Sequence, residues 1–438
     1  MRQRVMRQLV NCLPLAGSAA LVLAAARPSA ARAQSAVFEV PGLRGYVERV
    51  LQRNAGLRAA ESRLGAAERR IAPAGSLPDP MLTFGAMAVP VTSFDLDREP
   101  MTQFPLMVQQ RFPFPGKQAA ATAVARGDSS VAYAGRDALE AGLVAAAVRA
   151  YYAVAGAETA LPIWRARVAL ADQAIAVAQV RYETGTAPQT DLLRARLRRA
   201  ELDEERRELE AAVASAGARL DALRAGPGEA VFTPLLISTA VVPGLRGDSV
   251  PPGSVLRQAL IERSPPLLAA AAEAERARRT VRVFAVAGRP DFTLGLQAAV
   301  RGGGRETFVS ALVGVSVPLY AGRKQGPAAE AARLDAAAAE QRYDDLAAHL
   351  TGELGAAAAD LAALRDRILQ TADEILPLAE AASASALQRY QVGAIEFTAV
   401  LDAQDDLFRA QLRLARLIAG YGAAWGDLAA LIGEEWYR

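Results

Sequence analysis

The stretch RYETGT, residues 181–186, recurs as RYQVGA at residues 389–394, and the two copies lie 208 positions apart. The likeness continues at the same offset in three further pairs: Thr190 and Thr398, Leu193 and Leu401, Ala195 and Ala403. Self-similarity at a fixed offset is the signature of a repeated structural unit. The glycine in each copy allows the backbone to reverse without a Cβ penalty. We therefore predict two helix–turn–helix hairpins, one in each half of the chain.

Each half follows the same order, which is a helix, a pair of strands, a very long helix, the RYxxG turn and a returning helix. The junction FPFPGK at 112–117 corresponds to VPLYAGRK at 317–324. We expect the following boundaries: first repeat 34–225 with a β-hairpin at about 80–114, extended Pro/Gly-rich linker 226–253, second repeat 254–433 with a β-hairpin at about 290–320, and a short tail 434–438.

The long helices are predicted over 117–183 and 324–391, with a kink at Pro162. A helix of the first length spans about 100 Å, which does not suit a compact globule. The returning helix of the second half carries an apolar seam with steps of three and four: Val400, Ala403, Leu407, Ala410, Leu414, Leu417, Tyr421, Ala424, Leu428 and Leu431. Such a seam is typical of coiled-coil packing and also of a plain helical bundle.

The predicted strands alternate between apolar residues and small or polar ones. In the stretch 292–301 one face carries Phe, Leu and Val, and the triplet 302–304 is Gly-Gly-Gly, a turn signal. Strands of this kind fit a lipid-facing barrel or a soluble hairpin packed on helices. Four strands cannot close a barrel, because the smallest known have about eight. In lipid, several chains would have to share one barrel, since unpaired strand edges are too costly there.

The N-terminus reads as a secretory signal peptide over residues 1–33. Three arginines precede an apolar run, and Ala31-Arg32-Ala33 fits a cleavage site. The alternative is an N-terminal membrane anchor. Cys12 is the only cysteine, so we expect a mature chain without disulfides or thiolate metal sites. Residues 1–33 hold five Arg and no acid, and without them the formal charge falls from +3 to −2. This balance disfavours nucleic acid as a partner.

The sequence gives no support for enzymatic chemistry. His349 is the only histidine, and it stands inside a long helical pattern, where a surface or packed residue is expected more often than a metal ligand. There is no GxSxG motif or phosphate-binding loop. After the signal, no run of about 18 uninterrupted apolar residues predicts a membrane-spanning helix. We therefore expect no enzyme, no cofactor and no metal site.

With these motifs in their order, the chain resembles the TolC-like outer-membrane efflux proteins. The resemblance covers nearly all of the mature chain and includes the closing stretch AAWGDLAALIG at 423–433. It implies a mainly α fold with a β-barrel part, in which a long coiled-coil helical tunnel in the periplasm joins a transmembrane barrel in outer-membrane lipid. It further implies a homotrimer with four strands from each chain. FPFPGK is most similar to the heavy-metal and cation branch.

The family resemblance also implies partners and functions for named residues. The channel would passively complete a tripartite pump with a periplasmic adaptor and an inner-membrane transporter. The adaptor would meet the turns at five residues: Arg181, Tyr182, Gly185, Arg389 and Gly393. The periplasmic gate would use three others: Asp402 in an acidic ring, and Asp191 with Tyr390 as a carboxylate–phenol pair. Two family gate positions are changed here, to Ala399 and Ile395, so part of the closing network is absent.

Two other functions stay open at this stage. Within the channel class, the chain could serve type I protein secretion instead of small-solute or cation efflux. Outside it, the chain could be a soluble periplasmic coiled-coil scaffold or adaptor, although an adaptor would have one helical hairpin and not a duplicated unit. For the acids at the turns, the simpler interpretation is that Asp191 and Asp402 are solvated residues at helix starts, where the helix dipole favours a negative charge.

Overall fold

The computed structural model describes residues 42–89, 99–223, 241–247, 250–302 and 305–434. Every described element belongs to one unit, which spans residues 34–438. The predicted signal peptide with Cys12 and residues 435–438 of the predicted tail lie outside the described part. The predicted turn at 302–304 is described only at Gly302.

Two short helices open the first repeat, α1 (Leu43–Arg53) and α2 (Ala55–Gly75). Asn54 separates them, and its side chain caps α2 by accepting a hydrogen bond from the Leu57 N–H at 3.0 Å. Four elements follow in chain order: β1 (Met81–Phe84), β2 (Gln103–Phe112), α3 (Lys117–Glu183) and α4 (Gln189–Leu223). The long helix α3 has the bounds that its sequence predicts.

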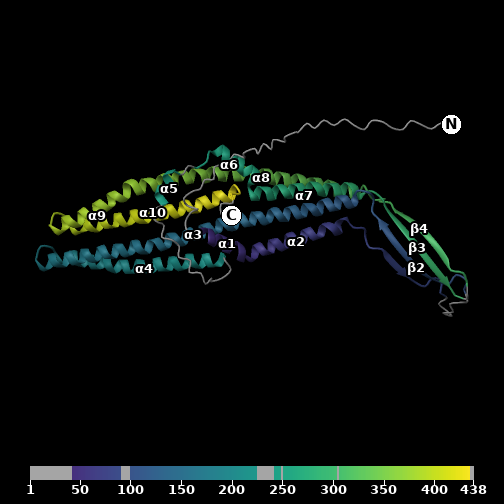
Figure 1. The fold of residues 1–438 in the computed structure, drawn as a ribbon, viewed down its shortest axis with the longest axis horizontal. Helices are drawn as coiled ribbons and strands as arrows, with labels where there is room; N and C mark the ends of the chain where they lie inside the picture. The colour runs from purple at the N-terminus through teal and green to yellow at the C-terminus, as the bar shows by residue number, and fades with distance from the viewer. Residues whose placement is uncertain (1–41, 90–98, 224–240, 248–249, 303–304, 435–438) are drawn as a thin grey trace, which may run out of the picture. The chain divides into compact units, whose positions relative to one another are not determined.

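The second repeat has the same order of elements. It contains α6 (Gly253–Arg263), α7 (Pro265–Ala287), β3 (Asp291–Arg301), β4 (Phe308–Ser316), α8 (Gln325–Gln370), the π-helical turn η1 (Thr371–Ile375), α9 (Leu376–Gln391) and α10 (Phe397–Leu431). In Figure 1 the hairpins α3/α4 and α9/α10 run side by side, α7 lies along α3, and α8 lies along α7. The unit is therefore built twice on one plan.

Part of the segment 226–253, expected to be extended, is helical. Residues Val241–Gly247 form α5, and Leu245 is fully buried. The backbone oxygens of Leu245 and Arg246 accept hydrogen bonds from Arg365 of α8 at 3.0 and 3.2 Å. The Arg246 guanidinium lies 2.5 Å from the Asp373 carboxylate. These contacts with the second long helix outweigh the extended preference of a Pro- and Gly-rich sequence.

The two long helices accommodate proline differently. Helix α3 continues through Pro162 as one element. The second long helix, expected to be continuous over 324–391, is interrupted by η1 just before Pro377. The Leu376 N–H donates to the Thr371 carbonyl, five residues back. Because Pro377 has no N–H to give to an α-helical bond, a wider turn at this point accommodates the missing donor.

The strands form one antiparallel sheet in the order β1-β2-β3-β4. The two predicted hairpins meet through β2 and β3, which pair from Gln103 opposite Arg301 to Phe112 opposite Phe292. Strand β1 is short, and Met87 adds one isolated bridge to Gln103. β1 and β4 each have one free edge within the described chain, because neither pairs with a second strand.

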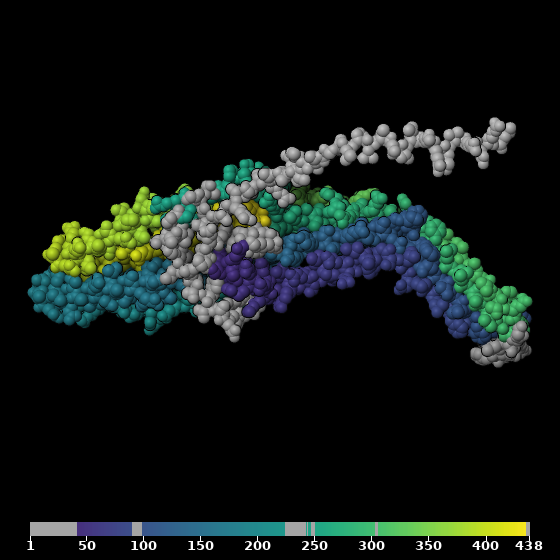
Figure 2. Space-filling view, in the orientation of Figure 1, coloured from purple at the N-terminus to yellow at the C-terminus, as the bar shows by residue number. Residues whose placement is uncertain are grey.

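The register collects most of the large apolar side chains of the four strands on one face. That face carries Leu82, Phe84, Phe104, Leu106, Val108, Phe112, Phe292, Leu294, Leu296, Val300, Val309, Val313 and Val315. Val309 and Val313 are each 75% exposed. Figure 2 shows the strands, blue near residue 105 and green near residue 310, uncovered by helices on the side in view. The opposite face carries residues such as Thr293, Gly295 and Gln297, which are small or polar.

A buried carboxylate joins the sheet to the long helix. The Asp291 side chain, 5% exposed at the first position of β3, lies 2.5 Å from Arg111 of β2 and 2.8 Å from Lys117, the first residue of α3. It also accepts a hydrogen bond from the Phe114 N–H at 3.0 Å, and the Asp291 N–H donates to the Ser316 hydroxyl. The Asp291 side chain thus fixes the FPFPGK junction and both central strands, and its backbone N–H holds the end of β4.

The packing of α3 against α10 depends on two glycines. A Cβ on Gly422 would lie 2.3 Å from Cζ of Tyr152, and one on Gly426 would lie 2.6 Å from Cγ1 of Val148. Tyr152 and Val148 are buried. Around this contact α10 buries Trp425 together with Tyr421 and Leu428 of the predicted seam, so this part of the seam is an interior face. The glycines let two backbones approach more closely than any side chain would allow.

By length and composition, one window of α3 could cross a membrane, although the sequence lacks an uninterrupted apolar run there. Half of that window is buried inside the unit. An interior helix of a helical domain has the same character, and the contacts of α3 with α2, α4, α7 and α10 give the apolar residues partners within the protein.

Asp291→Asn should weaken the junction by about 2 kcal/mol, because Lys117 and Arg111 lose the charge that compensates them. The urea midpoint of the folded protein in detergent is the measurement. Asp79→Asn, at an exposed acid just before β1, is the matched control and should leave the midpoint unchanged. Equal midpoints for both variants would contradict the importance of the junction.

Gly422→Ala should cost about 2–3 kcal/mol, because a methyl group at this position overlaps the ring of Tyr152 and forces the helices apart. The control is Gly420→Ala on the same helix, where the nearest atom to the new methyl is Leu364 Cδ2 at 4.0 Å. That change should be neutral or stabilising by up to about 1 kcal/mol through helix propensity. Thermal unfolding of both variants tests the difference, and a tolerated Gly422→Ala would refute the close approach.

Candidate functional site

The two RYxxG turns have the same backbone geometry. Gly185 has a φ of 68° and Gly393 a φ of 77°. In the first turn Thr186 N–H donates to the Arg181 carbonyl at 2.8 Å and Gly185 N–H to the Tyr182 carbonyl at 3.0 Å. In the second turn Ala394 and Gly393 donate to the matching carbonyls at 2.9 and 3.0 Å. This pair of bonds is the Schellman helix ending, which requires a residue with positive φ.

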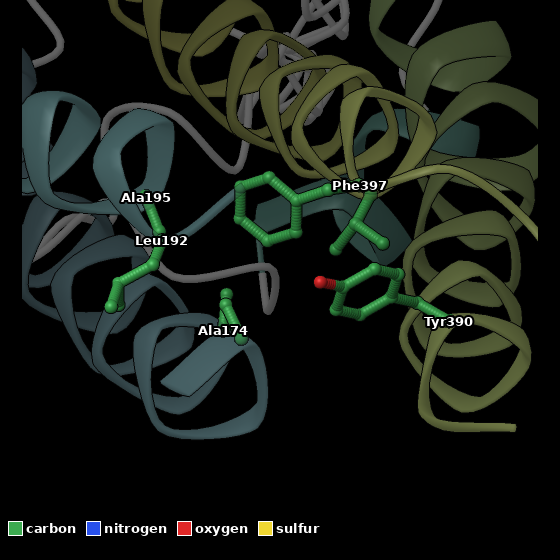
Figure 3. Packing of buried hydrophobic residues seen from close by; sticks show 7 residues of the cluster. Ala174, Leu192, Ala195, Tyr390 and Phe397 are labelled. Atoms are coloured by element: carbon green, nitrogen blue, oxygen red, sulfur yellow. The ribbon is translucent and has the colours of Figure 1, made fainter. Parts of the chain in front are cut away.

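A small hydrophobic cluster lies beneath the turns and connects the two hairpins. It contains Ala174 and Ala178 of α3, Leu192 and Ala195 of α4, Tyr390 of α9, and Phe397 and Val400 of α10. Figure 3 shows the Phe397 ring between the hairpins and beside the Tyr390 ring. Their ring centroids are 5.2 Å apart. The alanines let α3 lie close to its neighbours, so that a few large side chains fill the remaining space.

Arg181 joins the first turn to the second. Its guanidinium donates to the Tyr390 carbonyl at 2.5 Å and to the Thr186 carbonyl at 3.0 Å. It also lies over the Tyr390 ring, 4.5 Å from the centroid. A planar cation can satisfy carbonyl oxygens and stack on a ring at the same time. Arg181 therefore restrains the relative position of the two turns.

Tyr390 and Asp191 are brought together as the family resemblance implies. The Tyr390 hydroxyl donates to Asp191 Oδ2 at 3.2 Å, and Tyr390 is 1% exposed. Burial, followed by the negative charge of Asp191 and the hydrogen bond to it, raises the pKa of Tyr390 to about 12. The phenol is therefore neutral near pH 7 and acts as a donor. The bond runs from α9 to α4 and so crosses from the second hairpin to the first.

The other predicted site residues do not belong to this network. Asp402 is exposed on α10 and has no ion-pair partner in the described part of the chain. Arg389 is exposed, Tyr182 is 42% exposed, and Ile395 packs at the edge of the hydrophobic cluster. The exposed residues at the turns remain available to a partner, whereas Asp402 is separate from the contacts that hold the hairpins together.

An ion cluster that we did not predict lies farther from the turns. Arg167 of α3, 6% exposed, pairs with Glu205 of α4 at 2.7 Å and with Asp405 of α10. Arg198 of α4 contacts both oxygens of Asp405, at 2.7 and 2.9 Å. A comparison of the repeats could have revealed this ion cluster, because at the 208-residue offset Arg167 corresponds to Ile375 and Asp405 corresponds to Leu197. A charged residue at a position where the other repeat has an apolar one indicates a contact that is specific to one repeat.

Among the residues that the structure describes, no three His, Cys, Asp or Glu side chains are grouped so as to hold a metal ion. His349 is 68% exposed and lies 3.1 Å from Glu353, one turn farther along α8. This is the surface position that we expect for a lone histidine in a long helix.

The pKa of Tyr390 predicts a pH-dependent contribution to stability. Its folded value of about 12 lies above the ordinary value of about 10. The stabilisation is therefore fully present below pH 10 and is lost as the pH rises through 12. Tyr390→Phe should lower the unfolding free energy by about 1 kcal/mol at pH 8, and the difference from the native protein should shrink towards pH 12. Tyr182→Phe is the control, and a deficit that stays constant with pH would contradict this account.

Comparison with known proteins finds similarity over most of the chain. The family model described as outer membrane efflux protein matches residues 46–226 and 256–434, so it covers both repeats. A search of curated proteins finds no match. The same fold occurs in solved structures, including the outer-membrane channel OprN, with 20% identity, a TM-score of 0.76 and 92% of each chain covered.

CusC matches with 16% identity and a TM-score of 0.75, over 89% of this chain and 92% of that one. VceC from Vibrio cholerae matches with 20% identity and a TM-score of 0.73, over 89% of this chain and 96% of that one. Identities this low establish a common fold, and the family model establishes kinship over most of the sequence. The chain belongs to the outer membrane efflux protein family, a family of outer-membrane channels and not of enzymes.

Proposed function

We propose that three copies of this chain form the exit duct of a tripartite efflux pump. Each copy would give four strands to one barrel in the outer membrane and two helical hairpins to a periplasmic tunnel. A periplasmic adaptor and an inner-membrane transporter would deliver the cargo, and passage through the duct would be passive. We favour efflux over protein secretion because the matching family model is described as an efflux protein.

The observation that carries this proposal is the four-stranded sheet with two free edges and an exposed apolar face. In water such a face is an aggregation hazard, and in lipid each unpaired backbone group costs several kcal/mol. Both costs disappear if β4 of one copy pairs with β1 of the next and the apolar face meets lipid. Four strands from each of three copies give twelve, enough to close a barrel. A soluble scaffold would leave both features unexplained.

The turns of the hairpins fit the periplasmic end of the duct. In each copy, Arg181 and the Tyr390–Asp191 bond would hold the two hairpins together when the end is closed. The exposed residues Tyr182, Arg389 and Val392, beside Gly185 and Gly393, would be available to the tip of an adaptor. One Asp402 from each copy would form an acidic ring that favours cations, which fits small solutes or metal cations as cargo.

The mass of the detergent-solubilised complex from the outer-membrane fraction tests this proposal. Light scattering with correction for bound detergent should give three times the mass of the mature chain. A monomer has only four strands and cannot close a barrel, and the family resemblance implies three copies over the eight-stranded barrel that two would give. A monomer that stays in solution without detergent would overturn the channel proposal, and the sheet would then have to be covered by another soluble partner.

A further inference from the structure

The ion cluster around Asp405 connects the two hairpins at a level well away from the turns. Arg167 lies 16 residues before the end of α3 at Glu183, which is about 24 Å along the helix. Asp405 comes from α10, and its carboxylate lies between two guanidinium groups, Arg167 of α3 and Arg198 of α4. The Arg167 guanidinium also lies over the Phe408 ring of α10, 4.1 Å from the centroid. The cluster therefore joins three helices from both repeats.

Each arginine in the cluster has a second carboxylate within its own hairpin. Arg167 pairs with Glu205 at 2.7 Å, and Arg198 pairs with Glu201 at 2.7 Å. Both glutamates lie on α4, which belongs to the same hairpin as Arg167 and Arg198. If α10 moved away from α3 and α4, both arginines would keep a partner. Breaking a buried ion pair is usually strongly unfavourable because it leaves an uncompensated buried charge. Here no such charge would remain.

The charge balance of the cluster favours a reversible contact. With the hairpins together, three carboxylates surround two guanidinium groups. Burial raises the pKa of Glu205; the positive charge of Arg198 opposes this rise, and the negative charges of Asp405 and Glu201 add to it. Without Asp405 the remaining two carboxylates balance the two arginines. Asp405 itself is 24% exposed, so it needs little further movement to be hydrated. The attraction of Asp405 to the two arginines is thus opposed by the repulsion among the three carboxylates.

The repeat shows that this cluster is not part of the common framework. At the 208-residue offset, Arg167 corresponds to Ile375, Asp405 to Leu197 and Arg198 to Asp406. The quasi-equivalent face of α4 therefore presents Leu197, which is 61% exposed, where α10 presents Asp405. One copy of the plan holds an ionic contact and the other an apolar surface. The ionic contact is specific to the joint between the two hairpins of one chain.

We propose that Asp405, held between Arg167 and Arg198, is a second and releasable restraint on the periplasmic gate. It acts together with the Tyr390–Asp191 bond at the turns. The restraint holds α9/α10 against α3/α4 in the closed duct, and its ion pairs to Asp405 of α10 break when the hairpins separate. This inference rests on the proposed function as an exit duct.

The test is single-channel current in planar lipid bilayers, with the purified native complex and its variants. Asp405→Asn should raise the mean current at least threefold, because it removes the negative charge that holds α10 to Arg167 and Arg198. Both arginines keep their glutamate partners in this variant. Asp406→Asn is the matched control, since Asp406 is exposed and, within the described part of the chain, pairs only with Arg409 of α10, at 3.4 Å. Arg198→Gln should give a smaller increase, because Arg167 still holds Asp405. A purely structural role would lower the melting midpoint and leave the current unchanged.

Asp191→Asn separates this inference from the function on which it rests. If Asp191→Asn raises the current and Asp405→Asn, folded as judged by its midpoint, conducts like the native protein, the second restraint is refuted and the duct proposal stands. If neither variant nor the native complex carries current, the duct proposal fails as well. If both variants raise the current, the double variant should exceed either one, because the two restraints act at separate levels.

Discussion

The close approach of α3 and α10 is the interaction on which the rest of the structure depends. These helices belong to different repeats, and Gly422 and Gly426 let the backbone of α10 lie directly against Tyr152 and Val148. Once this contact is made, both hairpins must run side by side, and their turns must meet at one end. The contacts of α3 with α7, the helix that leads into β3, bring the two strand pairs together, so that β2 and β3 form a single sheet. A repeat alone would give two similar units without this joint.

Along that joint the bonding changes with distance from the sheet. Near the middle of the helices the contact is apolar and tight, with Tyr421 and Trp425 buried. Farther along, Arg167, Arg198 and Asp405 replace packing with charge. At the turns the contact combines hydrogen bonds from Arg181 and Tyr390 with the small hydrophobic cluster around Tyr390 and Phe397. Ionic and polar contacts can be exchanged for water, whereas a packed core cannot be opened without large cost. The contact between the hairpins thus changes from a tightly packed apolar one near the middle of the helices to a more ionic and polar one towards the turns.

The sheet imposes a different condition, which is met outside the single chain. Its register gathers most of the large apolar side chains on one face, and the outer edges of β1 and β4 have no partner in the described chain. The buried Asp291 ties this sheet rigidly to the start of α3 through Lys117. Any assembly that closes the barrel therefore also fixes the arrangement of the helices. In the duct that we propose, barrel closure and tunnel closure are coupled through this one carboxylate.

The sequence alone determined the elements that depend on local pattern. The duplicated RYxxG motif predicted both turns, because positive φ at Gly185 and Gly393 is a requirement of the backbone itself. Heptad-like spacing predicted the seam of α10, and alternation predicted the strands. The pairing of Asp191 with Tyr390 came from the family resemblance, since 199 residues separate the two and no periodic pattern links them.

Only the tertiary structure decided what depends on neighbours distant in sequence. α5 is helical because α8 binds its carbonyl oxygens, although its own sequence favours an extended chain. The second long helix widens into η1 before Pro377, while α3 continues through Pro162. The cluster of Arg167, Arg198 and Asp405 arises because three helices bring these charges together in a partly buried place. Local sequence fixes φ, periodicity and turns, whereas the energy of a charge or a proline depends on the groups that packing places around it.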